Sequence, residues 1–222
     1  MKRSFITVLI PLISLLTSCA NKNVRSDILE FIASFSIDSA IANYPVASYT
    51  REDISIENDK TSKVITTMSI NRSDHNNLAY DYREITYEEE VEKSNIHRYI
   101  EKNNDEYTYV TDSSSLTKSE EEVNALINTF FYTYTSDNIY LGGMFMGDTF
   151  RDIIPDIQDL VVIDNENKLL VYSYLNIMND ENKEVKIEQI VTLDNYGMLV
   201  KEDMKKTSDL GIFETHIAVK KM

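Results

Sequence analysis

The sequence predicts an α+β domain in which an incurved antiparallel sheet is covered on one face by an N-terminal helix and a central amphipathic helix. Most of the chain after residue 45 divides into segments rich in Val, Ile, Thr and Tyr that are separated by short polar turns, a pattern typical of antiparallel strands. Two further stretches carry apolar residues at helical spacing. The chain has only five Gly and three Pro residues and no linker-like stretch, so residues 26–222 are expected to form one domain.

The first helix is predicted directly after the N-terminal segment. Apolar residues recur there at helical spacing, at Ile28, Leu29, Ile32 and Phe35. Ser26 or Asp27 can cap the start of the helix, and Pro45 ends it, so it is expected to run to about Ile41 or Asn43.

A first meander of strands follows this helix. The expected strands are Tyr49–Ile56, Lys63–Arg72, Leu78–Glu89, Asn95–Lys102 and Glu106–Thr111. In the third of them the apolar residues change from one parity, which includes Tyr82, to the other, which includes Ile85. This change of phase predicts a bulge or a bend.

The central helix has the clearest signal in the chain. One face is marked by Val123, Leu126, Ile127, Phe130, Phe131 and Tyr134. Ser119 and Glu122 form a capping-box pattern at its start, with Thr117 and Glu120 as an overlapping alternative. A helix with such a stripe needs a sheet to cover it, and the stripe is interpreted as core.

A second meander is predicted after the central helix. Its expected strands are Leu160–Asp164, Leu169–Met178, Val185–Leu193, Met198–Thr207 and Ile212–Lys221, joined by turns rich in Asn and Asp. The strand Val185–Leu193 alternates apolar and polar residues, which indicates a sheet with one solvated face. Both parities of Leu169–Met178 are apolar, including Tyr172 and Tyr174, so both faces of that strand are expected to be covered.

The segment from Leu141 to Gly147 holds three of the five glycines beside Met144, Phe145 and Met146. Flexible apolar side chains next to glycines suit a mobile lid over an apolar cavity, because methionine adapts its shape to varied ligands. A buried loop between two helices is the other interpretation. Both remain open at this point.

Sequence motifs for chemistry are lacking. His75, His97 and His216 lie in separate segments without the spacing of a metal site, and no phosphate loop or nucleophile elbow is present. The net charge of −15 and the absence of a basic cluster argue against a nucleic-acid partner. We therefore expect no enzyme, no metal and no cofactor.

The N-terminus combines Lys2 and Arg3, an apolar stretch from Phe5 to Leu16, and the single cysteine, Cys19. Leu16-Thr17-Ser18-Cys19 resembles the lipobox of bacterial lipoprotein signal peptides. This resemblance implies that residues 1–18 are removed, that Cys19 carries acyl chains, and that residues 19–25 form a tether. The mature protein is then expected on the extracytoplasmic face of a cell membrane.

The order helix, meander, helix, meander resembles the LolA/LolB-like and LppX-type lipoproteins, in which helices plug a half-barrel that can hold acyl chains. The resemblance implies a membrane-anchored binding module for a lipid or another apolar ligand. The candidate ligand residues are Phe130, Phe131, Tyr134, Met144, Phe145, Met146, Tyr172 and Tyr174. An interaction protein of the envelope, an enzyme with a dispersed site and a purely structural lipoprotein are the alternatives. Tyrosines on the solvent face would favour a protein partner, and tyrosines lining a concavity would favour the carrier.

Overall fold

The computed structural model describes residues 28–74, 76–104, 106–132, 144–147, 151, 161–164, 167, 169–180 and 183–222. Of residues 161–164, 172–180, 183 and 184 it describes the backbone. The predicted signal peptide, Cys19 and the tether lie outside these residues. No helix within the described ranges is long and apolar enough to span a bilayer.

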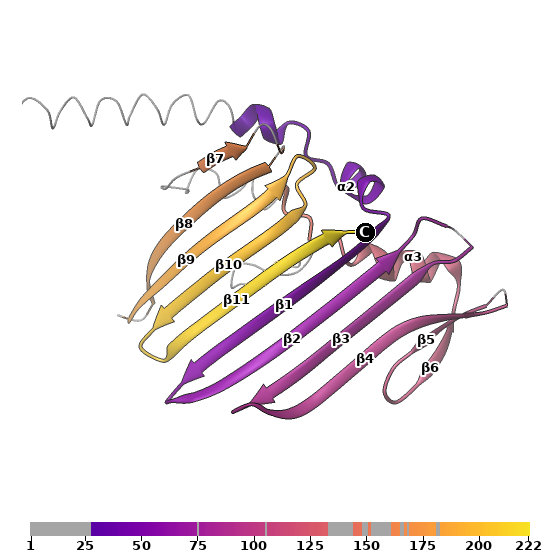
Figure 1. Ribbon diagram of the computed structural model, residues 1–222, viewed down its shortest axis with the longest axis horizontal. Helices are drawn as coiled ribbons and strands as arrows, with labels where there is room; N and C mark the ends of the chain where they lie inside the picture. Colours follow the sequence, from indigo (N-terminus) through magenta and orange to yellow (C-terminus); the bar gives the residue numbers. More distant parts are fainter. Residues whose placement is uncertain are drawn as a thin grey trace, which may run out of the picture.

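The described chain forms an antiparallel sheet of eleven strands, in the order β6-β5-β4-β3-β2-β1-β11-β10-β9-β8-β7 (Figure 1). The strands are β1 Val46–Glu57, β2 Lys60–Asn71, β3 Ala79–Glu88, β4 Val91–Asn103, β5 Glu106–Val110, β6 Ser115–Lys118, β7 Val161–Asp164, β8 Leu169–Asp180, β9 Lys183–Asp194, β10 Leu199–Ser208 and β11 Gly211–Lys221. Two meanders are thus joined where β1 pairs with β11. The predicted antiparallel sheet with few helices is confirmed, while β6 was not predicted.

The predicted bulge lies in a different strand. β3 pairs with β2 without interruption, and the register shift falls between β3 and β4, where Thr86 pairs with Ser94 and Tyr87 with Glu92. The extra residue is therefore Lys93 of β4. The parity change in β3 has a simpler cause, because its apolar residues occupy both faces of the sheet.

The predicted N-terminal helix is broken. Residues 28–32 are helical and α2 spans Ile37–Asn43, with residues 33–36 between them. The Arg151 guanidinium donates hydrogen bonds to the carbonyls of Ile32 (3.3 Å) and Phe35 (2.7 Å), so these groups are satisfied without a continuous helix. The end of α2 just before Pro45 agrees with the prediction.

The central helix, α3, spans Glu120–Asn128 and begins with the predicted capping box of Ser119 and Glu122. It ends before the predicted Tyr134, which lies outside the described residues. The Thr129 hydroxyl donates to the carbonyl of Leu126 (2.7 Å). The carbonyls of Phe130 and Phe131 accept from the N–H groups of Met144 (2.8 Å) and Phe145 (3.1 Å). These bonds replace further helical turns.

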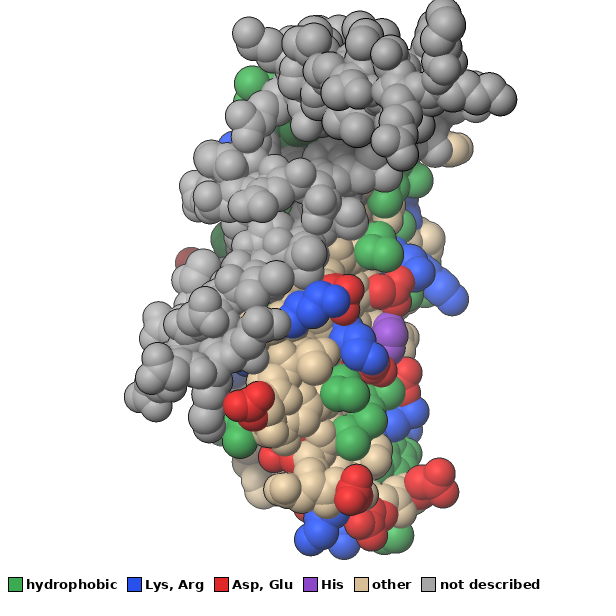
Figure 2. Space-filling view, turned by 90° about the vertical axis from the view of Figure 1, so that its left-hand side faces the viewer, with side chains coloured by type: hydrophobic (Ala, Val, Ile, Leu, Met, Phe, Trp, Pro, Cys, Tyr) green, Lys and Arg blue, Asp and Glu red, His purple; other side chains and the backbone are tan. Residues whose placement is uncertain are grey.

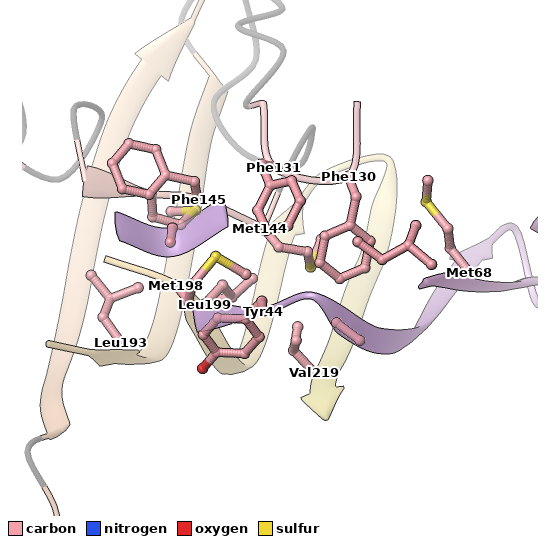
Figure 3. Close-up of a cluster of buried hydrophobic side chains, with 14 of the residues drawn as sticks. Tyr44, Met68, Phe130, Phe131, Met144, Phe145, Leu193, Met198, Leu199 and Val219 are labelled. Atoms are coloured by element: carbon pink, nitrogen blue, oxygen red, sulfur yellow. The ribbon is translucent and has the colours of Figure 1, made fainter. Parts of the chain in front are cut away.

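We call the face of the sheet that carries Ile70 and Val219 the inner face and the opposite one the outer face. The core lies against the inner face at the end of the strands near α2 and α3 (Figure 1). Val123 and Ile127 of α3 are fully buried there, and the ring of Phe130 packs on that of Tyr49 with centroids 5.7 Å apart. Figure 3 shows Phe130, Met144 and Met198 in this cluster.

Candidate functional site

The inner face changes character along the strands. Residues paired across the sheet form transverse rows, which can be followed away from the helices. The first row is Tyr82, Met68, Tyr49 and Val219; the second is Glu84, Thr66, Arg51, Ile217, Glu202 and Val191; the third is Thr86, Val64, Asp53, Thr215, Met204 and Gln189. We call Arg51, Asp53, Gln189, Glu202 and Thr215 the polar belt. It lies directly beyond the apolar core.

A bulge in β10 places Glu202 in this belt. Leu199 pairs with Leu193 and Lys201 with Thr192, so Val200 is an extra residue on β10. Without it, Leu199 and Glu202 would face opposite sides of the sheet, because side chains alternate along a strand. With it, both are buried. Bulges that re-aim a side chain are common next to functional sites.

The polar belt is held by short hydrogen bonds. Gln189 Nε2 donates to Glu202 Oε1 (2.5 Å) and Thr215 Oγ1 donates to Asp53 Oδ1 (2.6 Å). Arg51 Nε lies 2.6 Å from Asp53 Oδ2 in an ion pair. Glu202 and Thr215 are 0% exposed and Gln189 is 2% exposed. The belt therefore consists of two bonded groups: the buried pair of Gln189 and Glu202, and the group of Thr215, Asp53 and Arg51, in which Asp53 and Arg51 are partly exposed.

Burial dominates the electrostatics of Glu202. It raises the pKa of the Glu202 carboxyl from 4.5 to about 7, while the Gln189 hydrogen bond and the Arg51 charge act in the opposite direction. Asp53 and Asp203 add to the upward shift of this pKa. Over the described part of the chain, Glu202 Oε2 and Gln189 Oε1 are buried oxygens that accept no hydrogen bond. Such groups are rare in native proteins and are often functional.

Four tyrosines, Tyr49, Tyr80, Tyr82 and Tyr109, share the inner face. The Tyr82 hydroxyl donates to Glu84 Oε2 (2.6 Å), and the rings of Tyr80 and Tyr109 are 6.5 Å apart. Burial is the main cause that raises the pKa of Tyr49, Tyr80 and Tyr82 above the ordinary value. These rings present apolar faces and hydroxyl groups together, which suits an amphipathic ligand.

The predicted lid segment is buried where the structure describes it. Met144, Phe145 and Met146 are at most 5% exposed. The Met146 N–H donates to the carbonyl of Gly197 (2.8 Å), and Phe145 bridges to Met198 across an antiparallel pair. Residues 144–147 therefore form a buried segment that is bonded on both sides, and their role in ligand binding stays a prediction.

The other predicted ligand residues differ in how far the structure describes them. Phe130 and Phe131 are buried, with their rings in an edge-on pair 5.2 Å apart. Tyr134 lies outside the described residues. For Tyr172 and Tyr174 the backbone is described; these residues pair with Val191 and Gln189. They therefore occupy the same rows as the polar belt.

A groove of about 710 Å³ lies at the far end of the strands. Ser55, Ser62 and Glu88, which form one row on the inner face, line it together with Lys60 and Lys93. Its lining is mostly polar and charged, in contrast to the apolar lid segment predicted at Met144. The groove begins two positions along β1 from Asp53 and so continues from the polar belt.

The described histidines lie on the outer face, away from the polar belt. His97 Nε2 is 2.9 Å from Asp81 Oδ2, and His216 Nδ1 is 2.8 Å from Asp203 Oδ1. Hydrogen bonds from Lys201 and then His216 lower the pKa of Asp203. His75 lies outside the described residues. Within those residues, no three His, Cys, Asp or Glu side chains are grouped to hold a metal ion. Charged side chains of both signs are interspersed over the surface in Figure 2.

No protein-family model matches the chain, and no curated protein matches its sequence. Solved structures that resemble it weakly include the following three. A β-barrel-like DUF1849 protein from Brucella abortus shares 7% identity over 80% of this chain and 98% of its own, with a TM-score of 0.27. A domain assigned to outer membrane lipoprotein sorting, from Vibrio parahaemolyticus, shares 10% sequence identity over 87% of this chain and 89% of its own, with a TM-score of 0.23. A DUF1329 protein from Desulfovibrio piger shares 12% sequence identity over 86% of this chain and 89% of its own, with a TM-score of 0.19. These TM-scores are too low to carry a function over.

Sequence reasoning did not single out the polar belt. Glu202 lies in the charged run Lys201-Glu202-Asp203, where a solvent-exposed side chain is the ordinary expectation. One feature of the sequence could have indicated the bulge. The apolar residues Leu199 and Met204 are five positions apart in one predicted strand, so they share a face of the sheet only if an extra residue lies between them.

Proposed function

We propose that the chain is a binding module that holds an apolar ligand with a polar end against the inner face of the sheet. The carrying observation is a group of tyrosines on the inner face beside the polar belt. Tyr49 and Tyr82 lie in the row next to the belt, and Tyr80, which pairs with Ile70 and stands 6.5 Å from the ring of Tyr109, lies one row nearer the helices. A ligand there would meet apolar side chains at one end and hydrogen-bonding groups at the other. The proposal includes an incurved sheet whose inner face is covered by the N-terminal helical segment and α3.

Binding is favoured over catalysis by the separation of the ionisable groups. A dispersed active site would bring a histidine to the buried carboxylates to move protons. The buried carboxyl of Glu202 is on the inner face, whereas His97 and His216 are on the outer face with Asp81 and Asp203. We therefore expect the variant His97→Ala/His216→Ala to bind ligand as the parent chain does.

We also propose that the module is held at the extracytoplasmic face of a membrane by acyl chains on Cys19, as its signal-like N-terminus suggests. The N-terminal helical segment and α2 lie at one end of the sheet, and the β1–β2, β3–β4 and β10–β11 hairpins turn at the other end (Figure 1). The hairpin ends would then point away from the membrane.

A second candidate function is contact with another envelope protein. Exposed apolar side chains lie at the three hairpin ends, with Ile56 37%, Val91 58% and Leu210 69% exposed. Apolar side chains exposed together are a common feature of interaction sites. The partner would meet the module at the end opposite its anchor.

The test compares two tyrosines of one strand. Tyr82 lies on the inner face of β3 and Tyr87 on the outer face, and both are half-buried. In the full-length chain with Cys19→Ala, Tyr82→Ala should weaken binding of a fluorescent long-chain alcohol by about tenfold, since one buried aromatic contact is lost. Tyr87→Ala should leave it unchanged. No binding to the parent chain, or equal effects of both substitutions, would contradict the proposal.

A further inference from the structure

We propose that the free oxygens of Gln189 and Glu202 receive the head group of the ligand, and that this head group is a primary ammonium on an apolar chain. This inference rests on the proposed function, because it names the ligand class of the same inner face.

The two oxygens determine what the head group must supply. Glu202 is 0% and Gln189 is 2% exposed, and the hydrogen bond between them uses one acceptor of Glu202 and one donor of Gln189. Glu202 Oε2 and Gln189 Oε1 accept no bond from the described residues. A buried acceptor without a donor is costly, and a ligand that brings N–H donors removes that cost. An ammonium group has three such donors.

The charge of the polar belt also favours a cationic head group. Arg51 is paired with Asp53 at 2.6 Å, so these two charges offset each other. The remaining ionisable group of the belt is Glu202, which contributes a negative charge when ionised. A cation at Glu202 compensates that charge, whereas a carboxylate head group would place a like charge beside it.

The surroundings of the two oxygens suit an apolar chain. In the second row Glu202 lies between Ile217 and Val191, and in the third row Gln189 is next to Met204. All three of these neighbours are at most 7% exposed. The head group would thus be held in a mostly apolar setting, where a charge-assisted hydrogen bond is stronger than in water.

The experiment measures the binding of three probes that share one chain, dodecylamine, dodecanol and dodecanoate, to the full-length chain with Cys19→Ala. Titration calorimetry should give dodecylamine an affinity about tenfold higher than that of dodecanol and higher still than that of dodecanoate. The added variant Gln189→Met/Glu202→Met removes both free oxygens at similar side-chain volume. It should lose the preference for dodecylamine over dodecanol, because neither free oxygen is left to accept from the ammonium group.

Two further variants separate the causes. Glu202→Gln keeps the side-chain shape and removes the charge, so the preference for dodecylamine should fall while the fold is kept. Glu214→Gln makes the same change on the outer face, where Glu214 pairs with Lys205, and should have no effect. Equal affinities for the three probes, or an amine preference that survives loss of both oxygens, would overturn this inference alone. If none of the probes binds, the proposed function fails, and this inference fails with it.

Discussion

The hydroxyl of Tyr44 donates a 2.6 Å hydrogen bond to Oδ2 of Asp194, a residue 150 positions further along the chain. Oδ1 of Asp194 accepts from the N–H groups of Tyr196 (2.8 Å) and Met198 (3.0 Å). One carboxylate therefore shapes the β9–β10 turn and ties it to the residue after α2. Burial, followed by this hydrogen bond, raises the pKa of Tyr44.

Tyr44→Phe should lower the free energy of unfolding by about 1–3 kcal/mol, because it keeps the ring and removes a buried hydrogen bond to a charged group. Urea unfolding followed by circular dichroism measures the change. Tyr87→Phe, on the outer face, is the matched control and should change the stability little. Equal stability of both variants would show that the Tyr44 bond contributes nothing.

Glu202 should make the protein less stable as the pH rises. Its pKa in the folded state is raised from 4.5 to about 7, so the folded state binds more protons than the unfolded state between these values. The free energy of unfolding should therefore fall from about pH 4.5 to about pH 7, by on the order of 3 kcal/mol, and then level off.

The measurement is urea unfolding at several pH values for the parent chain and for Glu202→Gln. The difference in stability between the two should grow in favour of the variant over this pH range, because the variant cannot ionise. Glu214→Gln should follow the parent chain at every pH. A constant difference between Glu202→Gln and the parent would refute the shifted pKa.

Gly147→Ala should destabilise the core through Phe145. A Cβ at Gly147 would lie 2.5 Å from Cζ of the buried Phe145 ring, and overpacking of this kind costs about 1–3 kcal/mol. The double variant Phe145→Leu/Gly147→Ala should lose less stability than the sum of the two single changes, since the smaller side chain makes room. Strict additivity in thermal unfolding would exclude this contact as the cause.

Cys19→Ala should prevent attachment of the acyl chains and leave an uncut or wrongly cut precursor. Stable anchoring needs two or more such chains, so the variant should move from the membrane fraction to the soluble fraction. Mass spectrometry of the N-terminal peptide, with fractionation as a second readout, decides this. A variant that is still lipidated and held in the membrane would show that the lipobox prediction is wrong.

The elements that could be predicted are those specified by neighbouring residues. Ser119 and Glu122 lie three positions apart and together define the start of α3, and Pro45 stops α2 directly. The break in the N-terminal helix could not be predicted, because the group that satisfies the carbonyl of Phe35 is the guanidinium of Arg151, 116 residues away.

The same distinction holds for the candidate site. The unusual composition around Met144 was visible in the sequence, but its burial depends on partners such as Phe130 and Leu199, which are distant in the chain. Glu202 was hidden in a charged run, and its burial follows from one extra residue, Val200, in the pairing with β9. Register of this kind is decided between strands and not within one.

The position of β11 between β1 and β10 has a consequence for how the chain acquires its structure. The two meanders can each form from local hairpins, but Thr50 meets Ala218 only after 167 intervening residues have been made. Until β11 arrives, β1 and β10 are open edges able to pair with other chains. The joining of the two meanders into one sheet therefore waits for the C-terminal strand. A truncation before Gly211 would leave two aggregation-prone half-sheets.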